Sequence, residues 1–294
     1  MRFADIGQQL RAYRLESGLR AEEIAARLGV SRAALYRYEK GEVIKLDTIR
    51  RLAELLKISP LSLLGIGVDY FARPAGFLER LRQVEEQADQ ILLVGGAVCF
   101  QTLTEAYEGA LAEAWAEAAD QAQDRAQARA AADQALGMLT SRRRLYQQRK
   151  PTIIGILGEG ALRRFLQDGV AAGLPVSERT RSRCRAAAVT EAEAIAGLME
   201  SVPIGIQLGL GAGPDPIGSF MVLRGRDRAH VVANPFPPDA APSGTMGVAT
   251  ITAADDAVAV HQRVAETAWR EALKGTTAAA RVRELIAEVG QPRL

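Results

Sequence analysis

The chain has 294 residues, of which 48% are hydrophobic and 24% are charged, and its formal net charge is +2. This composition is that of an ordinary globular protein with a core of normal size, which argues against disorder, and the length predicts two domains. The two cysteines are too few for a disulfide framework, and no CxxC pair or His/Cys cluster has the spacing of metal ligands. We therefore expect no metal and no other cofactor.

The charge is unevenly distributed along the chain. Residues 1–67 hold 12 Lys or Arg side chains against 8 Asp or Glu, a net charge of +4, whereas the remainder holds 25 against 27. The positive excess therefore lies at the amino end, where it favours contact with a polyanion. The N-terminal segment lacks the apolar core of a signal peptide, and the longest apolar run, residues 91–100, is half as long as a membrane span requires. We expect a cytoplasmic protein with no membrane contact.

Five short helices are predicted in the first sixty-odd residues, because apolar side chains recur there at helical spacing. Gly29 is typical of a left-handed C-cap that ends the second helix, and Ser31 is a favourable N-cap for a third helix that runs to about Lys40. The apolar positions are Ile6, Leu10 and Tyr13 in the first helix, Leu19, Ile24, Ala25 and Leu28 in the second, and Leu46, Ile49, Leu52, Ala53 and Leu56 in the fourth, with a fifth helix over residues 59–64.

The block GLRAEEIAARLGVSRAALYRYEKGE carries a resemblance that extends over residues 6 to about 66. The preceding LRAYR segment, Ala25 at a helix crossing, Gly29 in the turn and the YRYEKG ending together resemble the Cro/C1 (XRE) helix-turn-helix family. The resemblance implies a recognition helix that lies in the major groove of DNA with its first turns toward the base edges. Ala21 departs from this family, which usually begins the second helix with glutamine, so we expect Arg20 to replace that phosphate contact.

The third helix is expected to bury Leu35 and Tyr38 and to turn its other side chains outward. Arginine can donate two hydrogen bonds to guanine, and an alanine methyl can contact the methyl of thymine. For Arg37 an ion pair with Glu39 or Glu42 on a solvated face is the alternative. The predicted base contacts are Arg32, Ala33, Tyr36 and Arg37, and the predicted phosphate contacts around the start of the second helix are Arg11, Arg14, Arg20 and Lys40.

After this head, residues 1–67, we expect a connector helix at residues 68–89 and an α/β domain at residues 90–294. Short β-like runs alternate there with helical ones. The predicted strands are ILLVGGAVCF, PTIIGIL, PIGIQLGL and GVATIT, with IGSFMVLRG and AHVVANPF as a hairpin about residues 225–228, and the predicted helices cover residues 159–171, 191–199 and 255–273.

A long segment rich in Ala, Gln and Arg, residues 104–148, has almost no helix breaker before Gly137, so one or two long helices are expected. Its alanine stripe suits close packing between helices. Two interpretations remain open, namely a dimer interface or lever arm on the one hand and an ordinary surface helix on the other.

The order of elements in the body, and the stretch SFMVLRGRDRAHVVANPF in particular, resembles a degenerate phospholipase-D-like fold of the kind found in the ligand-sensing domains of TrmB-type regulators. In the active enzymes a His-x-Lys pair lies on this strand. Here the corresponding places hold Ser219 and Met221, and His230 lies across the hairpin turn. The resemblance therefore implies a sensing domain without hydrolase chemistry, and we expect no enzymatic activity.

Arginines are concentrated in SERTRSRCR, residues 177–185. They suit an anionic metabolite through carboxylate or phosphate pairing, or equally a solvated surface between two elements. Cys184, which is flanked by two of these arginines, is a candidate redox sensor, although no resolving cysteine is near. The candidate effector-binding residues are Arg179, Arg183, Gln207 and Asn234.

The sequence therefore predicts an all-α, five-helix helix-turn-helix head followed by a larger α/β layered C-terminal domain. The expected protein is a sequence-specific transcription regulator that binds a pseudo-palindromic operator in double-stranded DNA as a homodimer or higher homo-oligomer and responds to a small-molecule effector. Two alternatives remain. One is a phosphodiester-processing enzyme with a DNA-binding tail, and the other is an antitoxin-like regulator whose body binds a partner protein.

Overall fold

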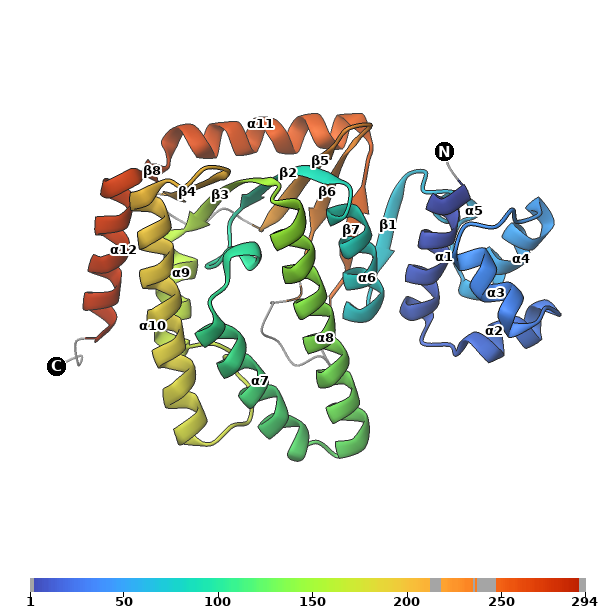
Figure 1. Ribbon diagram of the computed structural model, residues 1–294, viewed down its shortest axis with the longest axis horizontal. Coiled ribbons are helices and arrows are strands. Elements are labelled where there is room, and N and C mark those ends of the chain that lie inside the picture. The colour runs from blue at the N-terminus through green and yellow to red at the C-terminus, as the bar shows by residue number, and fades with distance from the viewer. Residues whose placement is uncertain (1–2, 212–217, 235, 237–246, 291–294) are drawn as a thin grey trace.

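The computed structural model describes residues 3–211, 218–234, 236 and 247–290. It consists of an N-terminal helical head and a larger body built on one sheet (Figure 1). The helices predicted for the head are confirmed, each within a few residues of its expected bounds. The head comprises α1 (Phe3–Ser17), α2 (Ala21–Leu28), α3 (Arg32–Glu39), α4 (Leu46–Leu56) and α5 (Pro60–Leu63).

The strands of the described residues form one mixed sheet in the order β1-β7-β6-β5-β2-β3-β4-β8. β3 is parallel to β2 and to β4, and the other neighbouring pairs are antiparallel. β5 and β6 form the predicted hairpin, in which Leu223 lies opposite His230. The strands are β1 (Val68–Phe71), β2 (Ala88–Val94), β3 (Thr152–Gly158), β4 (Ile206–Gly211), β5 (Phe220–Gly225), β6 (Ala229–Ala233), β7 (Ala249–Thr252) and β8 (Leu273–Lys274).

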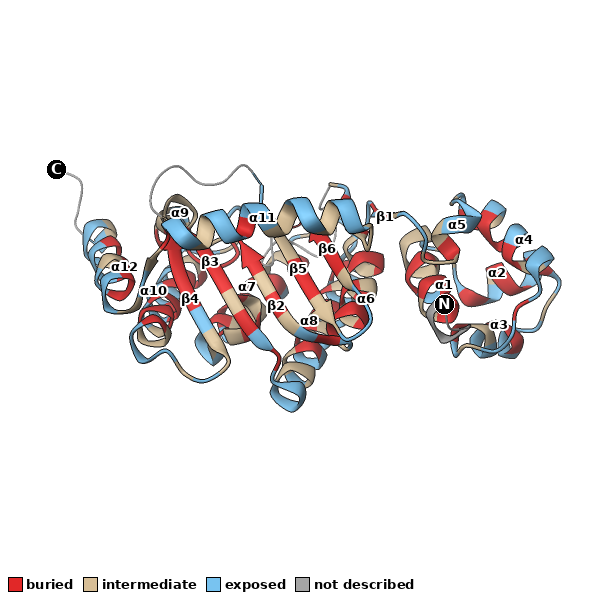
Figure 2. Cartoon of the chain, turned by 90° about the horizontal axis from the view of Figure 1, so that it is seen from above, coloured by how far each residue is buried: buried red, intermediate tan, exposed pale blue. Residues whose placement is uncertain are grey.

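Helices cover both faces of the sheet, which confirms the layered α/β body. α11 crosses one face, and α6 to α10 lie against the other (Figure 2). β2 is buried on both sides, since Ile91 and Leu93 belong to the large core beneath the helices whereas Leu92 and Val94 pack toward α11. The helices of the body are α6 (Pro74–Glu85), the short 3-10 helix η1 (Phe100–Thr102), α7 (Glu105–Asp120), α8 (Arg125–Arg149), α9 (Glu159–Asp168), α10 (Glu178–Ser201), α11 (Asp255–Glu271) and α12 (Gly275–Gly290).

The segment predicted as a connector helix is built differently. Residues 68–89 hold α6, but they also hold the whole of β1 and the first residues of β2. β1 pairs with β7 and is an edge strand of the body sheet. The connector is therefore part of the body. The sequence did not predict β1, because its four residues, one of them an aspartate, show too little alternation of apolar and polar side chains.

The alanine-rich segment forms two helices, α7 and α8, which turn back on each other (Figure 1). Four of their alanines are buried in a core cluster that also contains Trp115 and Cys184. The alanine stripe is therefore packed within the body, where small side chains let α7 approach both α8 and α10 closely. The buried alanines at these contacts are Ala110, Ala114, Ala132 and Ala135.

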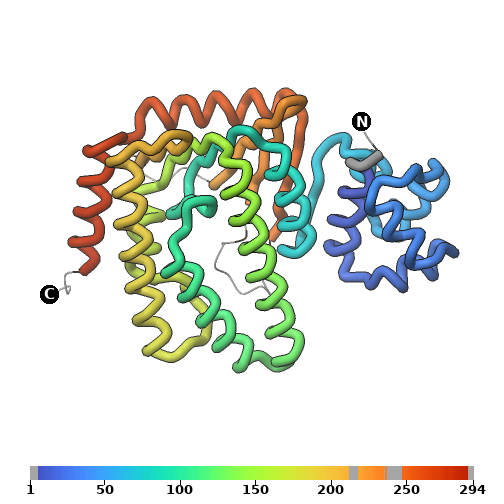
Figure 3. The backbone as a smooth tube through the Cα atoms, in the orientation of Figure 1, coloured from blue at the N-terminus to red at the C-terminus, as the bar shows by residue number. Residues whose placement is uncertain are grey.

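Two further helices differ from the prediction, since one is longer than expected and the other was not expected. α10 begins at Glu178 and ends at Ser201, so it includes the arginine-rich segment as its first turns. α12 was not predicted at all, although Val282 and Leu285 on it are buried. Both helices pack against each other at the β4 and β8 end of the sheet (Figure 3).

The head is attached to the body by α1, which packs along α6 (Figures 1 and 3). The centre of this junction is the buried carboxylate of Asp69, in β1. It accepts hydrogen bonds from Gln9 Nε2 at 2.8 Å and Tyr13 Oη at 2.9 Å, and it pairs with Arg80 Nε at 3.3 Å. Burial and the adjacent carboxylate both raise the pKa of Tyr13, which keeps its hydroxyl a hydrogen-bond donor.

α1 also contacts α6, and the residues just before it, through hydrogen bonds, close packing and an ion pair. Glu16 accepts hydrogen bonds from the backbone N–H groups of Ala72 and Arg73 where α6 begins. A Cβ atom added to Gly76 would lie 2.7 Å from the Cβ of Glu16, so only glycine allows this approach. Farther along, Arg11 pairs with Glu79 at 2.9 Å. The head is therefore held to the body by packed and hydrogen-bonded elements.

Candidate nucleic-acid interface and ligand cavity

The turn between α2 and α3 is set by local signals. Gly29 ends α2 with a φ of 73°, a conformation that favours glycine, and the Val30 N–H donates to Ala25 O at 3.0 Å. Ser31 then caps α3, since its Oγ accepts from Ala34 N at 3.1 Å. These contacts fix the direction in which α3 leaves the turn.

α3 has one buried and one exposed face. Ala34, Leu35 and Glu39 are buried against the head, whereas Tyr38 is half-buried. The four residues predicted to contact bases all lie on the other face and are exposed. They are Arg32, Ala33, Tyr36 and Arg37.

Both arginines on the exposed face of α3 have acidic partners. Arg32 pairs with Glu22 of α2 at 2.7 Å and also donates to the hydroxyl of Tyr36. Arg37 pairs with Glu42 at 3.3 Å, which is one of the two partners considered for it. More than half of each arginine side chain is exposed, so each pair is weak and its loss on meeting DNA costs little.

Two of the residues predicted to contact phosphate pair with carboxylates that are buried in the protein. Arg14 makes two hydrogen bonds to Glu39, at 2.6 and 3.2 Å, and its side chain is only 14% exposed. Arg11 faces α6, where it pairs with Glu79. Releasing Arg14 to a phosphate would leave the buried Glu39 carboxylate without its charge partner, which is costly. Arg14 therefore joins α1 to the end of α3.

The other two predicted phosphate contacts are on the surface. Arg20 precedes α2 and is highly exposed; its guanidinium and its backbone N–H both bind Glu23. These hydrogen bonds hold the pKa of the Glu23 carboxyl below its usual range. Lys40 is the exposed C-cap residue of α3. Both side chains remain candidates for phosphate contact.

Gly7 allows α1 to lie against the end of α3. A Cβ atom at this position would lie 2.5 Å from Tyr38 O and 2.6 Å from Glu39 O, and both of these are backbone atoms. We expect Gly7→Ala to lower the free energy of unfolding by roughly 1–3 kcal/mol through overpacking, as measured by urea denaturation. Gly137→Ala is the matched control, because Gly137 has nothing within 4 Å of its Cβ position. Alanine there should leave stability unchanged or raise it, and an equal loss in both variants would contradict this account.

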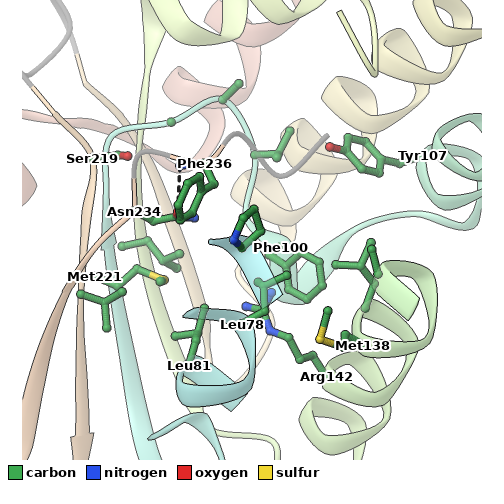
Figure 4. Close-up of a pocket in the computed structure, with 18 of the residues that line it drawn as sticks. Leu78, Leu81, Phe100, Tyr107, Met138, Arg142, Ser219, Met221, Asn234 and Phe236 are labelled. Atoms are coloured by element: carbon green, nitrogen blue, oxygen red, sulfur yellow. Dashed lines mark hydrogen bonds between the residues drawn. The ribbon is translucent and has the colours of Figure 1, made fainter. Parts of the chain in front are cut away.

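The body contains a cavity of about 560 Å³ on the face of the sheet that is covered by α6 to α10 (Figure 4). α6, α7, α8 and α9 form its walls together with β2, β5 and β6, and most of its lining is apolar. Polar groups on the lining include Ser219 and Asn234. Pockets of this size and character are typical of small-molecule sites.

A buried ion pair forms part of the cavity wall. Arg142 of α8 binds Glu85 of α6 through two hydrogen bonds, at 2.7 and 2.6 Å, and both side chains are almost completely buried. The guanidinium also lies over the ring of Phe100, 3.9 Å from its centre. Its charge is therefore balanced within the protein, and the pair ties two walls of the cavity together.

The structure does not bring the candidate effector-binding residues together. Asn234 lines the cavity, and its Oδ1 accepts from the backbone N–H of Phe236 at 2.9 Å. Arg179 and Arg183 are exposed on α10, with Arg183 paired to Glu113 at 2.8 Å, and Gln207 is exposed on β4. The arginine-rich segment is thus a solvated helix face. The apolar residues that line the cavity were missed, since in sequence they look like core.

Neither cysteine has the surroundings of a redox sensor. Cys99 and Cys184 are both buried. Burial raises the pKa of the Cys99 thiol to about 11, which disfavours the reactive thiolate. Cys184 faces the core between α10 and α7, so the neighbouring arginines point away from it into solvent. Within the described residues, no group of three or more His, Cys, Asp or Glu is placed to hold a metal ion.

The head matches a protein-family model described as a helix-turn-helix domain, over residues 5–63. No curated protein matches the chain. Among solved structures, TrmBL2, described as an archaeal chromatin protein with a novel mode of DNA binding, is similar at 12% identity with a TM-score of 0.33. That match covers 78% of this chain and 62% of TrmBL2, so the chain spans less than two thirds of its length.

The TrmBL2 likeness is too distant to indicate a shared fold, so the assignment rests on the head. In the described part of the chain no helix is long and apolar enough to cross a membrane. The family match covers α1 to α5. In the structure α3 begins with an N-cap and exposes one of its faces, as a recognition helix must. Residues 5–63 therefore form a helix-turn-helix domain, which supports a DNA-binding role for the chain.

Proposed function

We propose that the chain is a sequence-specific transcription regulator of the Cro/C1 (XRE) type, which reads operator DNA with α3. The observation that carries this proposal is the exposed face of α3, where Arg32, Tyr36 and Arg37 project from a helix whose other face is buried in the head. A helix of this form fits the major groove, and arginine can bind two acceptors of one guanine. The ion pairs that these arginines make on the surface are weak enough to be exchanged for DNA.

The regulator acts as a homodimer on a pseudo-palindromic operator. One head reads few base pairs, so selective binding requires two heads that reach half-sites about 34 Å apart. A small-molecule effector bound by the body changes the placement of the heads, because it binds the two arrangements with different affinity. The close packing of α1 on α6 supports this transmission. The proposal includes no catalytic step, and it places the protein in the cytoplasm.

Selection of bound duplexes from random DNA at a stated salt concentration tests this function. The expected result is an enriched inverted repeat whose half-site centres are separated by about one helical turn, or a multiple of it. Sedimentation of the free protein should give twice the mass of one chain. The proposal fails if no sequence is enriched at moderate ionic strength, with and without a small-molecule extract.

Lys40 is expected to bind a phosphate, because it is an exposed cation at the end of α3. Lys40→Ala should weaken binding to every duplex and should reduce the salt dependence of the affinity by roughly one ion. Arg270→Ala is the charge-matched control, since Arg270 is an exposed residue of α11 in the body. It should change neither quantity. A loss confined to one DNA sequence would instead mean that Lys40 reads a base.

A further inference from the structure

One helix, α6, is shared between the cavity and the head. Pro74, Ala75, Leu78 and Leu81 of α6 line the cavity. The opposite face of the same helix meets α1 through Gly76, Glu79 and Gln83, the last of which donates to Gln8 O at 3.1 Å. Whatever occupies the cavity therefore touches the helix against which the head is packed.

The lining of the cavity determines which molecules fit. Its interior is formed by large apolar side chains, several of them aromatic, from both the sheet and the helices (Figure 4). Ser219 and Asn234 offer uncharged polar groups near β5 and β6. The apolar lining residues labelled in Figure 4 are Leu78, Leu81, Phe100, Tyr107, Met138, Met221 and Phe236.

Among the described residues of the lining, the charged side chains do not offer an anion a buried partner. Arg142 already binds Glu85 through two hydrogen bonds. Arg164 and Asp168, which carry opposite charges, are exposed at the rim together with Gln134. An anionic ligand would therefore give up its hydration without gaining a salt bridge in the interior, which disfavours it.

We propose that this cavity binds an uncharged, largely apolar small molecule with an aromatic or branched aliphatic body, and that its occupancy is communicated to α3 through α6 and α1. This ligand class differs from the anionic metabolite that was one of the two interpretations of the arginine-rich segment. The second half of the proposal, communication to α3, rests on the proposed DNA-binding function.

Two sets of contacts connect the cavity to α3. An aromatic row begins at Phe236 in the cavity lining and passes through Phe77 and Phe71 to Tyr13 of α1, with ring centres 5.8, 6.4 and 5.4 Å apart. α1 then holds the end of α3 through the Arg14 ion pair with Glu39 and through the close approach at Gly7. A shift of α6 therefore cannot occur without repacking α1 or moving it with α3.

A matched pair of fluorescent probes tests the ligand class on the full chain. N-phenylnaphthylamine is uncharged, and anilinonaphthalene sulfonate has the same rings with a sulfonate added. We expect the uncharged probe to bind with a blue-shifted, enhanced emission and a Kd at least about tenfold lower than that of the sulfonate. Equal or tighter binding of the sulfonate, or no binding of the uncharged probe, would overturn the proposed ligand class.

Variants of α8 test whether the probe occupies this cavity. Ala135→Trp fills it, because Ala135 is buried and lines it, and should weaken binding of the uncharged probe at least about tenfold. Ala131→Trp, at a less buried lining position, serves the same purpose if the first variant does not fold. Ala130→Trp is the control, since Ala130 is exposed on the same helix. Probe affinity that is equal in a filled variant and in the control would place the probe elsewhere and refute the site.

A second experiment tests the communication with α3. It measures the affinity of the protein for the selected operator with and without saturating N-phenylnaphthylamine. We expect the operator Kd of the unchanged chain and of Ala130→Trp to shift at least about fivefold, and the Kd of the filled variant to stay constant. Probe binding with no shift in operator Kd would refute the communication between the cavity and α3. If no duplex is selected in the first place, the DNA-binding proposal fails, whereas the probe measurements still decide the ligand site.

Discussion

Replacing Asp69 by alanine is expected to lower the free energy of unfolding by about 3–5 kcal/mol, the cost of removing one partner from a buried ion pair. Arg80 would lose its charge partner, and Gln9 and Tyr13 would lose their common acceptor at the junction of head and body. Urea denaturation followed by circular dichroism measures the change. Proteolysis should also become faster around residues 64–73, because the head would be held less firmly.

An exposed aspartate provides the control for this experiment. Asp89 also pairs with an arginine, Arg149, at 3.2 Å, but both side chains are about half exposed. Asp89→Ala should therefore cost less than about 1 kcal/mol. If the two variants lose the same stability, the network around Asp69 does not hold the head to the body.

Arg37→Ala is expected to relax the base preference at one position in each half-site. Loss of two hydrogen bonds to guanine would reduce discrimination there by about 1–3 kcal/mol, which is roughly 5- to 150-fold in relative affinity. The side chain is free to make this contact at small cost, since its ion pair with Glu42 is exposed. Repeating the selection from random duplexes with the variant measures the effect.

Arg50 supplies the comparison for Arg37 within the head. It is an exposed arginine of α4 that pairs with Asp47 at 3.1 Å, so Arg50→Ala removes the same charge from a similar environment. This variant should select the same motif as the unchanged chain. Should Arg37→Ala also select that motif, Arg37 would have no part in reading bases.

The head was largely predictable because its signals are local. Its helices follow from apolar spacing, and the turn before α3 follows from Gly29 and Ser31, whose cap geometry the structure confirms. The exposed side of α3 then follows from helical periodicity, since burying Leu35 and Tyr38 leaves Arg32 and Arg37 outside. The match to a helix-turn-helix model covers this same region.

The partners of charged residues were less predictable. Arg14 and Glu39 lie 25 positions apart, and only the packing of α1 on α3 shows that they form a pair. In the sequence, Arg14 is one of several cations near the expected DNA surface. The sequence likewise gives no sign that Arg183 of α10 pairs with Glu113 of α7, so the arginine-rich segment is open there to interpretation as a ligand site.

Sequence by itself determined that the chain has a helix-turn-helix head, which side chains α3 turns outward, and that an α/β body follows. These properties depend on residues within a few turns of one another. Only the tertiary structure decided that α6 belongs to the body, that one of its faces lines a cavity and that the other carries the head. The reason is physical: a cavity is formed by side chains from many separate segments, and each of them is, in its own segment, an ordinary apolar core residue.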